Sequence, residues 1–222
     1  MAGVSWDVPA VSQFRIFMLD ATRWNHIRYT IWAPIYDVIK PLFDRHRRKS
    51  IALLHIERQD RVLLIGCGTG LDLEHLPPAK EILATDLTPA MVERTAKRMK
   101  DQNIKGRAAV MDAQALALPD ASYDKIIMHL ILAVVPDPVR SLQEAERVLK
   151  PGGEIAVFDK FVPPGQRPHL MRRFFNLITK PLFTSIDRRF EDILRNTSLV
   201  AEKDVTVGMG FGFRLILLRK PV

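Results

Sequence analysis

The sequence predicts an α/β fold built on a doubly wound, mostly parallel sheet of seven strands. From residue 61 onward, short apolar runs alternate with segments of helical pattern. The first run ends in a glycine-rich turn, Gly66-Cys-Gly-Thr-Gly70. Strands that alternate with helices pair in parallel through right-handed crossovers, which places ligands beyond the carboxyl ends of the strands. A glycine turn at such an end brings bare backbone and a helix N-terminus against a ligand.

The region before the first strand is expected to form a helical cap, over residues 1–58, ahead of the main domain at 59–222. Apolar and aromatic residues follow helix-like spacing over residues 11–39, with an interruption at Pro34. This pattern predicts two or three short helices.

The main domain divides into strands and helices in order. A helix beginning at Pro89 has Thr88 as its expected cap, and Lys150-Pro-Gly-Gly153 predicts a stop and a turn. An insertion is expected at 161–198, before an antiparallel hairpin joined by the glycines of 207–212. The predicted strands are 61–65, 81–85, 107–111, 123–129, 154–160, 200–207 and 211–219, with helices from about 70, at 89–101 and at 137–150.

Composition limits the classes of protein that fit. The chain has 222 residues, enough for one α/β domain with additions. The net charge of +8 points to an anionic surface or substrate, either membrane lipid or nucleic acid. A single cysteine, Cys67, excludes an internal disulfide and a multi-cysteine zinc site, and no metal-ligand spacing is found. With no apolar run near the roughly 20 residues of a membrane span and no secretory signal pattern, we expect a cytoplasmic protein, with peripheral membrane contact as an option.

Four motifs in register carry a family resemblance over residues 60–160. They are Gly66-x-Gly68-x-Gly70, an acid at Asp86 after the second strand, the segment Asp112–Pro119, and Leu149-Lys-Pro-Gly-Gly153. The region resembles class I S-adenosylmethionine-dependent methyltransferases, which have a Rossmann-like fold. The resemblance implies S-adenosylmethionine as the cofactor and no metal. It implies cofactor contacts from Gly66, Cys67, Gly68, Gly70, Asp86, Leu87, Met91, Asp112, Ala113 and His129.

Two acids have expected roles at the cofactor. Asp86 follows the glycine turn by about 20 residues, at a strand end where a carboxylate can accept from both ribose hydroxyls. The resemblance gives Asp112 to the adenine amino group, with the backbone of Ala113 at the ring edge. A turn-stabilising role is the alternative for Asp112. The family usually carries an acid two residues before the first glycine, where this chain has Leu64.

Two further residues are candidates for catalysis. Ile31-Trp-Ala-Pro-Ile-Tyr-Asp37 resembles a segment of quinone C-methyltransferases and bacterial phosphatidylethanolamine N-methyltransferases, which implies that Tyr36 lies over the pocket. Tyr29 is a weaker candidate, and packing in a helix core is the alternative for both rings. His129 ends the fourth strand, where the family faces the methyl group, so it could contact substrate or accept a proton. The alternative for His129 is a hydrogen-bonded core residue.

The expected function is methylation of a membrane-associated small molecule, with a phospholipid head-group amine as the favoured acceptor. A basic cluster at 45–49 and a basic, amphipathic stretch at 169–183 are typical of contact with anionic membrane lipid. A solvated helix face and a lid over the pocket are the alternatives for these segments. C-methylation of a quinone precursor, a soluble acceptor and a non-catalytic binding protein stay open. Nucleic acid is disfavoured because the N/D-P-P-Y/F motif is missing after the fourth strand.

Overall fold

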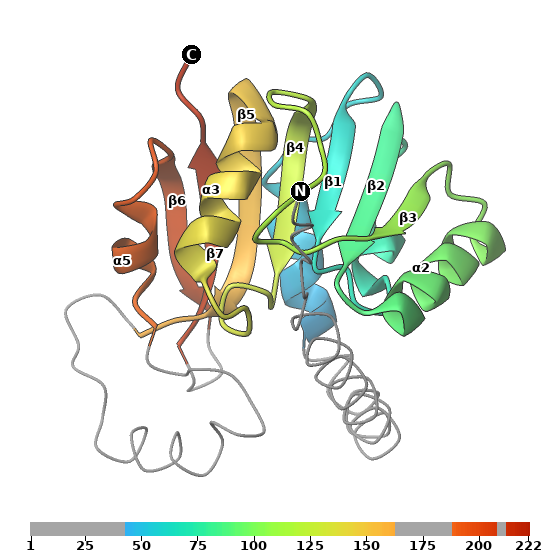
Figure 1. Cartoon of the computed structure of the whole chain (residues 1–222), viewed down its shortest axis with the longest axis horizontal. Helices are drawn as coiled ribbons and strands as arrows, with labels where there is room; N and C mark the ends of the chain where they lie inside the picture. The colour runs from blue at the N-terminus through green and yellow to red at the C-terminus, as the bar shows by residue number, and fades with distance from the viewer. Residues whose placement is uncertain (1–42, 163–187, 208–211) are drawn as a thin grey trace, which may run out of the picture. The chain divides into compact units, whose positions relative to one another are not determined.

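The computed structural model describes residues 43–162, 188–207 and 212–222 (Figure 1). The chain divides into two compact units, 1–44 and 45–222. Residues 43–52 are helical, and the elements that follow lie in the second unit. They are β1 (Arg61–Ile65), the 3₁₀ helix η1 (Leu71–His75), β2 (Glu81–Asp86), α2 (Pro89–Asp101), β3 (Arg107–Val110), β4 (Tyr123–His129), α3 (Pro138–Val148), β5 (Leu149–Lys160), α5 (Phe190–Leu194), β6 (Val200–Val207) and β7 (Phe213–Arg219).

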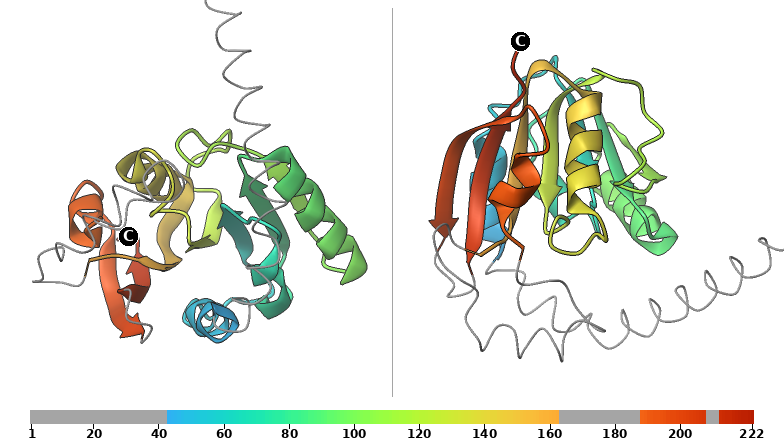
Figure 2. Two further views of the ribbon diagram at one scale, coloured as in Figure 1. Left: turned by 90° about the horizontal axis from the view of Figure 1, so that it is seen from below. Right: turned by 60° about the vertical axis from the view of Figure 1, so that its left-hand side comes forward.

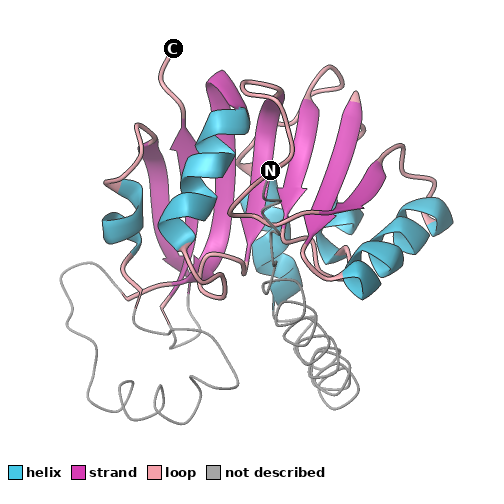
Figure 3. Cartoon of the chain, in the orientation of Figure 1, coloured by secondary structure: helices cyan, strands magenta, loops and turns pink. Residues whose placement is uncertain are grey.

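The sheet has the predicted class and strand number. Its seven strands run in the order β3-β2-β1-β4-β5-β7-β6, as Figures 1 and 3 show. β1 to β5 pair in parallel, while β7 is antiparallel to both β5 and β6. The order of the strands reverses between β1 and β4, and such a switch point is where open α/β sheets bind ligands. The glycine turn and the segment after β4 both lie at this point.

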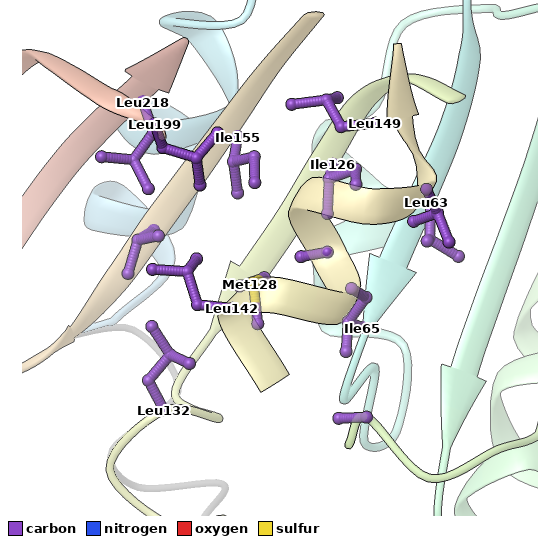
Figure 4. Close-up of a cluster of buried hydrophobic side chains, with 14 of the residues drawn as sticks. Leu63, Ile65, Ile126, Met128, Leu132, Leu142, Leu149, Ile155, Leu199 and Leu218 are labelled. Atoms are coloured by element: carbon purple, nitrogen blue, oxygen red, sulfur yellow. The ribbon is translucent and has the colours of Figure 1, made fainter. Parts of the chain in front are cut away.

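Alternate residues of each strand fill the two faces of the sheet, as the pleat requires. Leu63 of β1 joins a buried cluster with side chains of α3 and α5, and Figure 4 shows Leu142 of α3 near Met128 of β4. Leu64 joins a second cluster on the opposite face. Figure 2 shows the helix at 43–52 on the side of the sheet opposite α3.

The compact unit begins earlier than the domain boundary expected at residues 58/59. Ile51 lies in the first described helix and Leu54 lies just after it. These two side chains are 3% and 0% exposed and pack with Leu64 and Ile82. This helix is therefore part of the core of the sheet domain. The remainder of the expected cap, residues 1–42, lies outside the described residues. Within the described residues, no helix has the length and apolar character needed to cross a membrane.

Three local predictions were wrong or incomplete. The helix expected from about residue 70 is only the short η1, because Pro77 and Pro78 come just after its C-cap, Leu76. Thr88 is at the N-cap of α2, but its side chain makes no capping hydrogen bond. The turn expected at 150–153 is instead part of β5, where the register against β4 shifts and Gly152 has φ of +75°.

Candidate cofactor and active site

The glycine turn after β1 forms a close-packed loop with one open side. Gly66, Gly68 and Gly70 all have positive φ, at +72°, +55° and +79°. A Cβ on Gly66 would lie 2.5 Å from Cδ1 of Ile131, in the segment after β4, whereas a Cβ on Gly68 would meet no described atom within 4 Å. Space for a ligand therefore adjoins the backbone at Gly68.

The loop is fixed by hydrogen bonds to β2 and α2. The backbone N–H groups of Gly66 and Cys67 donate to the carbonyl of Thr85 at 2.8 and 2.9 Å. The hydroxyl of Thr95 donates to the carbonyl of Gly68 at 2.9 Å. These bonds hold the loop in one conformation before any ligand arrives, which lowers the entropy lost on binding.

Asp86 lies where the sequence placed it, at the carboxyl end of β2 and against the glycine loop. Its Oδ2 accepts from the backbone N–H of Gly68 and its Oδ1 from that of Thr88, both at 2.9 Å. A carboxylate has about four acceptor positions, so two remain for a ligand's hydroxyl groups. Leu87 beside it is 65% exposed, an apolar surface that a bound ring could cover.

The other expected cofactor residues differ in exposure. Asp112 accepts from the backbone N–H and side-chain amide of Gln114 at 2.9 and 3.1 Å, which is the turn-stabilising arrangement. Ala113 and Met91 are each 7% exposed. Asp112 still follows β3 at the ligand end of the sheet, so its turn holds the backbone of Ala113 at that edge.

His129 is the centre of a buried polar network, rather than an exposed group at the strand end. Its side chain has 0% exposure. Nδ1 lies 2.7 Å from Oδ1 of Asp72, and Nε2 lies 3.0 Å from the hydroxyl of Ser50. Asp72 in turn accepts from Nη1 of Arg47, at 2.8 Å from each carboxylate oxygen. We call Arg47, Ser50, Asp72 and His129 the Asp72 network.

The charges of the network assign its hydrogen bonds. Burial raises the pKa of Asp72, but the charges and hydrogen bonds of His129 and Arg47 outweigh burial and bring that pKa well below its usual range. An ionised carboxylate only accepts, so His129 donates through Nδ1. Nε2 of the same ring lies 3.0 Å from the Ser50 hydroxyl. Both ring nitrogens are therefore engaged within the protein.

Sequence reasoning did not find this network, because its members are far apart in the chain. Arg47 belonged to the basic cluster expected to meet lipid, yet its side chain is 13% exposed and faces Asp72. The other cations of this cluster, Arg45, Arg48 and Lys49, are exposed. Tyr36, Tyr29 and the amphipathic stretch at 169–183 lie outside the described residues.

Cys67 in the glycine loop is chemically protected. Its side chain is buried, and burial raises the pKa of the thiol to about 12. Because the thiolate is the reactive form, we expect native protein to resist a thiol-specific disulfide reagent at pH 8. The same protein should react fully in denaturant, as absorbance of the released chromophore will report. Fast reaction of the folded protein would contradict this.

Asp159 is a second buried acid that the sequence did not single out. It is 1% exposed, near the end of β5. Its oxygens accept from the backbone N–H groups of Ala133 and Lys160 at 2.9 and 2.8 Å. It thereby holds the segment after β4, which contacts Gly66 through Ile131. Burial raises its pKa to about 6, against hydrogen bonds that lower it.

The raised pKa of Asp159 makes folding stability depend on pH. The protonated form is favoured in the folded state, so its contribution is complete below about pH 4 and is lost as pH rises through about 6. The loss amounts to about 3 kcal/mol. Asp159→Asn removes this titration. Between pH 4 and 7, the free energy of unfolding of the variant, measured with urea, should therefore rise by about 3 kcal/mol relative to that of the wild type. A constant difference would contradict the assignment.

The strand order and the glycine loop are typical of α/β proteins that bind nucleotide cofactors. Comparison with known proteins narrows this class. The family model of a methyltransferase domain matches residues 63–157. A phosphatidylethanolamine N-methyltransferase from Cereibacter sphaeroides is 30% identical over 60% of this chain and 66% of its own length. A demethylmenaquinone methyltransferase from Thermus thermophilus is 30% identical over 60% of this chain and 63% of its own. The chain thus spans slightly less than two thirds of these relatives.

Solved structures of low identity share the fold. A [4+2]-cyclase, SpnF, superposes with a TM-score of 0.69 at 19% identity, covering 81% of this chain and 82% of the cyclase. A geranyl diphosphate methyltransferase solved with its cofactor has a TM-score of 0.66 at 15% identity, over 81% and 85% of the two chains. Over residues 63–157 the chain therefore contains a methyltransferase domain, and its fold is that of the class I S-adenosylmethionine-dependent methyltransferases.

The residues present fit S-adenosylmethionine. Open space adjoins Gly68, the Asp86 carboxylate can take ribose hydroxyls, and exposed Leu87 offers an apolar surface beside it. When bound, this cofactor supplies a methyl group on a sulfonium centre. The acid that the family usually carries before the first glycine is here Leu64, which is 1% exposed within the core. Leu64 therefore cannot hold the cofactor's amino group.

Proposed function

We propose that the protein methylates the head-group amine of a phospholipid of the phosphatidylethanolamine type. The observation that carries this choice is the burial of His129. Methylation of a ring carbon requires a base that makes the carbon nucleophilic, and His129 is the base that the sequence offers at the strand end. With its side chain 0% exposed and both nitrogens bonded, it is not presented to an acceptor. A primary amine carries its own lone pair once a proton has left to water.

The protein's task in such a reaction is alignment. The glycine loop and Asp86 would fix the cofactor, and the acceptor would need an approach in line with the methyl–sulfur bond. Orientation of this kind can account for roughly 7 to 11 kcal/mol of a barrier. We include Tyr36 in the proposal as a residue over the acceptor, on the resemblance of residues 31–37 to the segment of phospholipid and quinone methyltransferases.

Exposed cations support a lipid acceptor. Arg45, Arg48 and Lys49 lie on the helix at 43–52, and the whole chain carries a net charge of +8. Each cation near an anionic bilayer contributes up to about 1 kcal/mol of binding. The phosphatidylethanolamine N-methyltransferase and the demethylmenaquinone methyltransferase described above match the same share of this chain. C-methylation of a quinone precursor is therefore the second candidate.

The proposal is tested by transferring radiolabelled methyl from S-adenosylmethionine into a total lipid extract and resolving the products by thin-layer chromatography. We expect label in phospholipid spots that comigrate with methylated phosphatidylethanolamine. Label in a quinone spot instead would overturn N-methylation in favour of the second candidate. Label in neither, with cofactor binding intact, would point to a soluble acceptor. Asp86→Ala is the matched control for label that does not depend on the cofactor site.

Membrane contact is tested separately. Co-sedimentation with vesicles containing anionic phospholipid should be strong at low salt and weak at high salt, because exposed charges are screened. The variant Arg45→Ser/Arg48→Ser/Lys49→Ser should bind less, while Arg61→Ser, in an ion pair with Glu81 on β2, should bind as the wild type does. Equal binding of both variants would remove the basic cluster from the proposal.

A further inference from the structure

The Asp72 network joins three parts of the fold at the ligand end of the sheet. Asp72 lies in η1, two residues after Gly70 of the glycine loop. His129 ends β4, the strand next to β1. Arg47 and Ser50 come from the helix at 43–52. The network therefore connects the far end of the glycine loop to both the neighbouring strand and the preceding helix.

The hydrogen bonds of the loop itself run in the opposite direction, while Ile131 after β4 packs against Gly66. The described bonds of the loop to Thr85, Asp86 and Thr95 all run toward β2 and α2. On the side of β4, Asp72 makes the contacts with His129 and Arg47. A loop fixed on both sides presents its open backbone at Gly68 in a single position, and errors of about 1 Å in such positioning can reduce function about 100-fold.

A stabilising role alone does not account for a buried ionic network. Well-packed apolar side chains in place of buried ion pairs are often as stable, since ion pairs lose hydration on burial. Asp72 is 3% exposed and Ser50 is 0% exposed, so their hydration is almost fully lost. What the ionic contacts add is direction, because Nη1 of Arg47 and Nδ1 of His129 fix the carboxylate in one orientation.

We propose that Arg47, Asp72 and His129 are positioning residues that set the affinity for S-adenosylmethionine by fixing the glycine loop against β4 and the helix at 43–52. This role replaces the cofactor contact that the resemblance implied for His129, whose ring nitrogens face Asp72 and Ser50. The effect of the three residues passes through Asp72 to Gly70 and so to the backbone at Gly68. The inference concerns the cofactor alone and does not depend on the identity of the methyl acceptor.

The test separates affinity from stability with two variants, by calorimetric titration with S-adenosylmethionine and by urea unfolding. Asp72→Asn leaves the Arg47 charge buried without its partner, so it should lower stability and raise the cofactor Kd by about 10- to 100-fold. Arg47→Met/Asp72→Asn removes both charges, while the oxygen of the introduced amide can still accept from His129. The double variant should recover most of the lost stability but retain a Kd at least several-fold above the wild type.

Recovery of the wild-type Kd in the double variant would overturn the proposal, since the network would then act only through stability. Unchanged affinity in Asp72→Asn would also overturn it. If Asp72→Asn does not fold, Arg47→Lys keeps the charge and should still raise the Kd, because the shorter lysine side chain does not reach the position from which Nη1 of Arg47 contacts both carboxylate oxygens. Lys125→Met is the control: it breaks the partly buried Lys125–Glu154 pair of 2.5 Å on β4 and β5, and should lower stability without changing the Kd.

Discussion

Asp86→Ala should weaken binding of S-adenosylmethionine by about 2 to 3 kcal/mol, which is about 30- to 150-fold in Kd. The variant removes the carboxylate that would accept from the ribose hydroxyls. It also releases the backbone N–H groups of Gly68 and Thr88 from their 2.9 Å hydrogen bonds, so the glycine loop loses one of its fixed contacts. Isothermal titration calorimetry with the folded variant measures the effect.

The matched control is Asp86→Asn. The amide keeps one oxygen acceptor and nearly the same shape, so it separates charge from geometry. We expect a Kd between those of the wild type and Asp86→Ala. An affinity for the alanine variant within twofold of the wild type would refute the assignment of Asp86 to the cofactor.

Gly66→Ala and Gly68→Ala should destabilise the fold to different degrees. At Gly66, a Cβ would lie 2.5 Å from Ile131 on a backbone with φ of +72°, so clash and strain act together. At Gly68 only the strain of φ at +55° remains, about 1 to 2 kcal/mol, because no described atom lies within 4 Å. Gly66→Ala should therefore lose clearly more unfolding free energy than Gly68→Ala.

For cofactor affinity we expect the opposite order, with the larger loss in Gly68→Ala. The open space beside Gly68 is what we assign to the cofactor, so the new methyl group should reduce affinity at least tenfold although the fold is largely retained. Urea unfolding and calorimetry on the same preparations report the two quantities. Full affinity in Gly68→Ala would mean that the cofactor does not approach this backbone.

The centre of the sheet was predictable because β1, β2, β4 and β7 are short, mostly apolar and buried runs. Prediction failed where local signals conflict with tertiary contacts. Leu149-Lys-Pro-Gly-Gly153 has the composition of a turn, but pairing with β4 draws it into β5 as an irregular strand. The helix expected from about residue 70 is only the short η1, because the two prolines at 77 and 78 cannot continue it.

At the site, local motifs located the cofactor residues but could not show their partners. Asp86 follows from one rule, an acid at the carboxyl end of a strand, and the same rule applied to β5 would have found Asp159. The Asp72 network had no such signal. Arg47, Asp72 and His129 are separated by 25 and 57 residues, and only the strand order brings them together.

The position of β7 has a consequence for biosynthesis. β7 lies between β5 and β6, and it follows both of them in the chain. While the ribosome is still adding the residues before 213, β5 has an open edge and β6 has no strand to pair with. The cofactor half of the sheet, β1 to β5, can assemble during translation, but the sheet closes only after residues 213–219 have emerged. Until then the nascent chain presents an unpaired apolar strand, which is a site for chaperone binding or for pairing with other nascent chains.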